Sequence, residues 1–136
     1  MELVIAGAKP HSRIRMLASD HVIVTGWVDD PREYYKNSSL FVAPMQIGTG
    51  LQNKLLEAMA MQRPCITTPL ANNALGARPG TEILIADSPD EWAEIIVTLL
   101  ANEKERNRIA ENGRNFVMRK FSWPAQIETL HQIIES

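Results

Sequence analysis

Between Leu40 and Met61 the chain reads LFVAPMQIGTGLQNKLLEAMAM. Its first four residues are apolar and predict a short strand over Leu40 to Ala43. A turn with two glycines follows, and the residues from about Leu51 to Met61 predict a helix. Arg63-Pro64 ends that helix because proline cannot continue it. The stretch therefore has the order strand, glycine turn, helix that is typical of α/β folds.

Similar strand signals occur on both sides of this stretch. Short apolar runs rich in β-branched residues predict further strands over Glu2 to Ala6, Val22 to Thr25, Cys65 to Thr68 and Ile83 to Ala86. The runs are nearly continuous in apolar residues instead of alternating with polar ones. We therefore expect strands that are covered on both faces, as in a parallel sheet.

Helical segments lie between these strands and after them. They are predicted over Ser12 to Ala18, from Asp30-Pro31-Arg32-Glu33, from Ser88-Pro89-Asp90-Glu91, over Glu103 to Arg119 and over Trp123 to Ile134. Asp30 and Ser88 each show an N-cap residue, a proline at the first helical position and a glutamate two residues later. The alternation predicts an α/β fold, a Rossmann-like open parallel sheet of about five strands flanked by helices.

The composition is that of one ordinary globular domain. The 136 residues are 45% apolar and 22% charged with a net charge of −2, so we expect a single domain over residues 1–136. The longest apolar runs are too short to cross a bilayer, and no basic surface points to nucleic acid as a partner. The single Cys65 and a start without a signal-peptide pattern predict a cytoplasmic location, with Cys65 an inert core thiol.

The glycine turn and the helix after it form a candidate ligand site. In open α/β sheets, ligands bind beyond the carboxyl ends of the strands. Gly48 and Gly50 flank Thr49 and let the backbone come close to a ligand, while the first N–H groups of the next helix favour an anion such as a diphosphate. Glycines also occur in such turns for steric reasons alone, so the turn by itself leaves both explanations open.

Lys54 and Glu57 add charge to this helix. Glu57 lies in an otherwise apolar run from Leu55 to Met61, and we expect a carboxylate in a buried helix to need a partner, since an unpaired buried charge is costly. One candidate partner is Lys54, three residues earlier. The other is a ligand whose vicinal hydroxyls donate to Glu57 while its phosphates face Lys54. That spacing suits a nucleotide ribose beside its diphosphate.

These residues resemble a known family. The likeness is to the donor-binding, C-terminal half of GT-B glycosyltransferases of group 1, family 4, and it rests on Phe41-Val42-Ala43-Pro44, Gly48-Thr49-Gly50, Lys54-Leu55-Leu56-Glu57-Ala58-Met59-Ala60-Met61 and Pro64. Three flanking segments, 25–30, 80–86 and 121–123, extend the resemblance over essentially the whole chain. It implies the transfer of a hexosyl group from a nucleotide-diphosphate sugar of UDP or GDP type, without a metal or another cofactor.

The resemblance also implies roles for individual residues. Glu57 is similar to the second glutamate of the family's paired-glutamate motif, which holds the ribose hydroxyls. The turn of Gly48, Thr49, Gly50 and Leu51 would touch the donor sugar and phosphates, and Lys54 would contact the diphosphate or Glu57. The family's first glutamate falls on Thr49, so the usual carboxylate contact to the donor sugar is missing. No catalytic residue and no metal ligand are assigned.

The resemblance further implies that part of the enzyme is absent. GT-B enzymes have two Rossmann-like halves, and this chain would begin at the second strand of the C-terminal half. The acceptor-binding half, the first strand of the donor half and the loop after it are then missing. We expect the chain alone to bind donor weakly and to transfer nothing, since the acceptor, a saccharide or glycolipid, needs the absent half. A peripheral membrane location is a further expectation for the full-length protein.

Two other functions fit the sequence. One is a non-catalytic nucleotide-sugar-binding or assembly domain, completed by a partner chain or by a second copy that pairs through an exposed sheet edge. The other is a fragment of a GT-B-like nucleotide-sugar epimerase, which the run from Lys54 to Ala60 disfavours.

Overall fold

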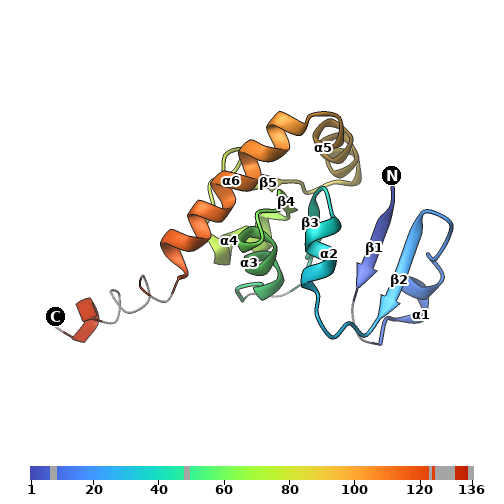
Figure 1. Ribbon diagram of the computed structural model, residues 1–136, viewed down its shortest axis with the longest axis horizontal. Helices are drawn as coiled ribbons and strands as arrows, with labels where there is room; N and C mark the ends of the chain where they lie inside the picture. The colour runs from blue at the N-terminus through green and yellow to red at the C-terminus, as the bar shows by residue number, and fades with distance from the viewer. Residues whose placement is uncertain (7–8, 48–49, 123, 125–130, 135–136) are drawn as a thin grey trace. The chain divides into compact units, whose positions relative to one another are not determined.

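The chain divides into two compact units in a computed structural model that describes residues 1–6, 9–47, 50–122, 124 and 131–134 (Figure 1). The units are Met1–Asn37 and Ser38–Ser136, and each is described by itself. The expected single domain over residues 1–136 stays a prediction.

The first unit contains a parallel strand pair and two short helices. They are β1 (Leu3–Ala6), α1 (Ser12–Arg15), β2 (Val22–Gly26) and α2 (Arg32–Asn37). Leu3 lies opposite Val22, which confirms the two predicted strands. Leu3, Val4 and Ile23 remain 38–42% exposed, so the expected cover on both faces is wrong for these strands. The reason is that α1 has only four residues and no buried side chain.

The second unit contains a three-stranded sheet and longer helices. In chain order these are β3 (Phe41–Ala43), α3 (Asn53–Ala60), β4 (Cys65–Thr67), α4 (Pro69–Leu75), β5 (Leu84–Ile85), α5 (Pro89–Ala101) and α6 (Glu103–Lys120). The strand order is β3-β4-β5, and both pairings are parallel. Every residue of the central strand β4 is buried, as expected for a parallel strand with cover on both faces.

The predicted α/β class is confirmed, with one difference in the sheet. All five predicted strands are present and every pairing is parallel. They form two sheets, β1-β2 and β3-β4-β5, where we expected one sheet of about five strands. The division follows the two units, because in the described residues no strand of Met1–Asn37 pairs with a strand of Ser38–Ser136.

The helix starts agree with the sequence in one case and differ in another. The Ser88 hydroxyl accepts from the Glu91 amide at 3.2 Å, which confirms the predicted start of α5. The Asp30 carboxylate instead accepts from the Arg32 amide at 3.0 Å and pairs with the Arg32 guanidinium, so α2 begins one residue later than expected. The last predicted helix, over Trp123 to Ile134, lies largely outside the described residues.

Helix α4 was not predicted. The Thr68 hydroxyl accepts from the Ala71 amide and so caps its first turn, Pro69 occupies its first position, and Gly76 ends it in the left-handed conformation at φ +74°. These are ordinary start and stop residues, but the helix has only seven residues, of which Ala71 and Leu75 are buried.

The core of the second unit holds α3 in place. Ile66 of β4 packs with Ala86 and Leu99, and α6 packs against both α3 and α5 (Figure 1). Cys65 is buried, and its burial raises the pKa of its thiol far above the ordinary value, which agrees with an inert core thiol. Among the described helices, none is long and apolar enough to span a membrane.

Gly113 of α6 marks the closest approach in this packing, and Gly113→Ala tests it. Alanine favours a helix by about 1 kcal/mol over glycine, but its Cβ would lie 2.8 Å from the Glu82 carbonyl oxygen and 3.3 Å from the Met59 methyl carbon. Because overpacking costs about 1–3 kcal/mol, we expect a net loss of up to about 2 kcal/mol in the free energy of unfolding. Urea denaturation followed by circular dichroism measures it.

The matched control is Asn115→Ala, an exposed position of the same helix. This variant should be neutral or slightly stabilising because it meets no close neighbour. If Gly113→Ala proved as stable as Asn115→Ala, the close packing of α6 on α3 would be contradicted.

Candidate functional site

The loop from β3 to α3 carries the turn that the sequence singles out. Gly48 and Thr49 lie outside the described residues. Gly50 and Leu51 are exposed and stand directly before α3. The predicted order of strand, turn and helix is thus confirmed, and it places the start of α3 at the carboxyl edge of the β3-β4-β5 sheet.

Among the described residues, no side chain caps the start of α3. Its N-cap residue is Gln52, which forms no cap hydrogen bond with its side chain and instead donates to the Gly50 carbonyl at 3.3 Å. In α4, α5 and α6 a side chain accepts from the first turn. The Gln52 side chain therefore leaves the first backbone amides of α3 without a cap. Uncapped amides at a helix start attract anions.

Lys54 and Glu57 lie on the outward side of α3. Leu55, Ala58 and Met59 are the buried residues of this helix, whereas Lys54 and Glu57 are exposed. Two residues three positions apart share one helix face, so both charged groups border the same surface. The expectation that Glu57 lies in a buried helix was wrong, since the helix turns its polar residues outward and no burial cost falls on the carboxylate.

Lys54 is not held by an ion pair of its own. Within the described residues, the ion pairs join Asp30 with Arg32, Glu105 with Arg108, and Glu82 with Arg119. Lys54 takes part in none of them, which disfavours the alternative that it simply neutralises Glu57. The start of α3 therefore carries an exposed ammonium group beside the amides.

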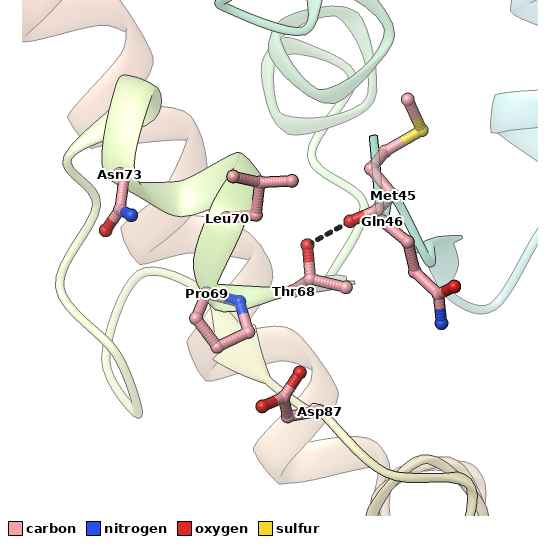
Figure 2. A pocket seen from close by; sticks show the side chains of 7 residues that line it. All are labelled: Met45, Gln46, Thr68, Pro69, Leu70, Asn73 and Asp87. Carbon is pink, nitrogen blue, oxygen red and sulfur yellow. Dashed lines mark hydrogen bonds between the residues drawn. The ribbon is translucent and has the colours of Figure 1, made fainter. Parts of the chain in front are cut away.

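A cavity of about 400 Å³ opens at the same edge of the sheet (Figure 2). It is lined by Met45, Gln46, Thr68, Pro69, Leu70, Asn73 and Asp87. Met45 and Gln46 follow β3, the next four belong to the end of β4 and to α4, and Asp87 follows β5. The volume lies in the range of small-molecule sites. None of these seven is among the site residues that the sequence analysis assigned, although Met45 and Gln46 lie in the stretch that it singled out and the others end or follow predicted strands.

Two neighbouring threonines hold one wall of this cavity. The buried Thr67 hydroxyl donates to the Ala43 carbonyl at 2.9 Å, and the Thr68 hydroxyl donates to the Met45 carbonyl at 2.6 Å (Figure 2). The Thr68 oxygen also accepts from the Ala71 amide at 3.3 Å. The strand β3, the residue after it and the start of α4 are thereby tied together.

In the part of the chain that the structure describes, no group of three or more histidine, cysteine, aspartate or glutamate side chains is placed to hold a metal ion. The polar groups at this edge of the sheet come from α3 and from the lining of the cavity. They are the Lys54 ammonium, the carboxylates of Glu57 and Asp87, the amides of Gln46 and Asn73, and the N–H groups at the start of α3. Such groups bind a ligand that combines an anionic part with hydroxyls.

Parallel strands joined by crossover helices, with ligand-accessible loops at their carboxyl edge, define a Rossmann-like α/β fold. Comparison with known proteins gives the family. The model of the glycosyl transferases group 1 matches residues 1–102, and the chain belongs to this family.

Individual relatives agree with this assignment. The chain is 34% identical over 104 residues to the capsular polysaccharide biosynthesis glycosyltransferase CapM of Staphylococcus aureus, a match that covers 75% of this chain and 27% of CapM. It is 26% identical over 141 residues to an uncharacterized glycosyltransferase of Methanocaldococcus jannaschii, covering 98% of this chain and 36% of that protein. The chain thus spans about a third of the length of these relatives.

A solved structure shows the same fold. HepE of Anabaena, in complex with UDP and glucose, superposes with a TM-score of 0.82 over 99% of this chain and 40% of its own, at 14% identity. At that identity the likeness shows the fold alone.

Thr68→Val tests the wall of the cavity. Valine keeps the shape of the side chain but removes both the bond to the Met45 carbonyl and the cap of α4. A lost cap costs about 0.5–2 kcal/mol and a lost buried hydrogen bond about 1 kcal/mol, so we expect the free energy of unfolding to fall by about 1–3 kcal/mol. Urea denaturation measures it.

Two further variants make this test specific. Thr68→Ser keeps the hydroxyl and should retain most of the stability, whereas Thr98→Val, at an exposed position of α5, should change it little. A Thr68→Val chain as stable as Thr98→Val would show that the hydroxyl does not tie the loop to α4.

Proposed function

We propose that this chain is the donor-binding part of a group 1 glycosyltransferase and that it binds a nucleotide-diphosphate sugar of UDP or GDP type. One observation carries the proposal: Lys54 and Glu57 share the exposed side of a helix whose start has no side-chain cap and lies at the carboxyl edge of the sheet. Family membership supports it, as does the similar fold of HepE, whose structure holds UDP.

The ligand would lie along α3. Its diphosphate meets the N–H groups at the helix start and the Lys54 ammonium, which together offset its negative charge. Glu57 lies four residues after Asn53, which is about 6 Å along the helix axis at 1.5 Å per residue. That distance separates a diphosphate from the ribose hydroxyls of the same nucleotide, so the Glu57 carboxylate accepts hydrogen bonds from them.

The same groups would serve the reaction as well as the binding. When the bond between the anomeric carbon and the diphosphate oxygen breaks, the oxygen of an acceptor hydroxyl bonds to that carbon, and the hydroxyl proton passes to the departing diphosphate or to water. Negative charge then grows on the departing diphosphate. Preorganised amides and the Lys54 ammonium stabilise this charge more in the transition state than in the bound donor, which lowers the barrier. The scheme uses no metal ion.

We also infer that this chain supplies only a part of the catalytic unit, since it spans about a third of its relatives.

Glu57→Ala tests the ribose contact. Hydrogen bonds to a charged group contribute about 1.5–3 kcal/mol, so the variant should bind UDP or GDP at least about tenfold more weakly than the wild type. Isothermal titration calorimetry with UDP, GDP and ADP measures it and shows which base is preferred.

Lys54→Ala should also weaken binding and reduce its dependence on salt, because it removes a charge that faces the phosphates.

Glu111→Ala is the matched control, an exposed glutamate of α6 that does not line the cavity. Its affinity should equal that of the wild type. Equal affinity in Glu57→Ala and the wild type would remove Glu57 from the ribose contact, and an absence of nucleotide binding by every variant would contradict the proposed function.

Transfer is expected to be absent from the isolated chain. Catalysis requires an acceptor oxygen held in line with the anomeric carbon, and that acceptor would be bound by residues outside this chain. Incubation with UDP-glucose or GDP-mannose and a mixture of mono- and disaccharides should give no product above the protein-free control in mass spectrometry. Product formed by the chain alone would overturn the inference that it supplies only a part of the catalytic unit.

A further inference from the structure

Three polar side chains that line the cavity at the carboxyl edge make no polar interaction within the described residues. In the described residues, the side chains of Gln46, Asn73 and Asp87 take part in no hydrogen bond or ion pair, although they line the same cavity. Asn72, their neighbour in sequence, shows the contrast, since its amide binds both backbone groups of Ala77. Gln46, Asn73 and Asp87 are therefore available to a ligand.

Asp87 is held in a fixed position by its backbone. Its amide donates to the Glu91 carboxylate at 2.8 Å, within the cap that starts α5. Figure 2 shows its carboxylate directed toward Pro69, with Thr68 between it and the side of the cavity formed by Met45 and Gln46. The backbone of Asp87 is thus linked to the first turn of α5, and its exposed carboxylate is accessible to hydroxyl donors.

The mixture of side chains indicates a neutral ligand rich in hydroxyls. Met45, Pro69 and Leu70 give the cavity an apolar wall, which suits the C–H face of a sugar ring. Asp87 is an acceptor for hydroxyl hydrogens and repels phosphate. The anion-binding groups, the start of α3 and Lys54, do not line the cavity, so the phosphates and the cavity's occupant occupy separate places.

The direction of α3 decides which part of a nucleotide sugar reaches the cavity. The helix starts at the carboxyl edge and runs back along the sheet, as the crossover between the parallel strands β3 and β4 requires. A ribose at Glu57 with a diphosphate at the helix start points the chain of the ligand toward that edge. The next group beyond the diphosphate is the transferred sugar, and the base lies on the opposite side.

We propose that this cavity holds the transferred hexosyl group and that Asp87 supplies a carboxylate contact to its hydroxyls. Gln46 and Asn73 contribute further hydrogen bonds at the rim. The inference rests on the proposed function and adds the group that recognises the sugar. It makes Asp87 a specificity-determining residue.

The test compares nucleotide with nucleotide sugar. The wild type and Asp87→Ala are titrated with UDP and UDP-glucose, and with GDP and GDP-mannose, using isotope-labelled chain and nuclear magnetic resonance to measure weak affinities. Loss of a charge-assisted hydrogen bond should weaken sugar-nucleotide binding about tenfold or more and leave the affinity for the nucleoside diphosphate within about twofold. Asp90→Ala, in the first turn of α5 and outside the cavity, is the control and should match the wild type for every ligand.

Each other result overturns the inference, and the pattern shows where it fails. Equal loss for UDP and UDP-glucose would place the nucleotide in the cavity. Unchanged binding of both by Asp87→Ala would remove Asp87 from the site while leaving the proposed function intact. A wild type that binds none of the four ligands would overturn the inference and the proposed function together. Circular dichroism of Asp87→Ala confirms that the variant is folded before the comparison.

Discussion

The site depends on the pairing of β3 with β4 and on the two threonine hydroxyls that extend it. Backbone hydrogen bonds align Ala43 with Thr67, and the hydroxyls of Thr67 and Thr68 then hold the carbonyls of Ala43 and Met45. Because these groups are buried, leaving them without partners would be costly, so the loop leaves β3 along one path. One wall of the cavity takes its position from this contact.

One side of helix α3 packs into the core, and its other side faces outward at the candidate site. Leu55, Ala58 and Met59 anchor it on the sheet and on α6, while Lys54 and Glu57 face outward. A binding residue on a helix that is packed this firmly keeps its position without a network of its own. The close contact at Gly113 belongs to the same support, since α6 can approach Met59 only where it has no side chain.

Much of this fold could be predicted from the sequence, because the strands are short apolar runs and α5 begins with a complete cap at Ser88. The burial of Glu57 was predicted wrongly, since an apolar run with one acidic residue does not reveal that Leu56, Ala60 and Met61 are only half-buried. Helix α4 was missed because it has only seven residues between Thr68 and Gly76, too few for a clear helical period. The cavity could not be predicted from the sequence. Gln46, Asn73 and Asp87 follow three different strands, and they line one cavity only because those strands are neighbours in the sheet.

The far end of α6 is linked to the wall of the cavity. The Lys120 ammonium donates to the Leu75 carbonyl at the end of α4 at 3.0 Å and lies 5.5 Å and 5.3 Å from the ring centres of Phe116 and Phe121. The last turn of the longest helix thus holds α4, whose other end lines the cavity. Any shortened version of this chain made for crystallisation has its C-terminal limit after Phe121, because truncation before that point would release α4.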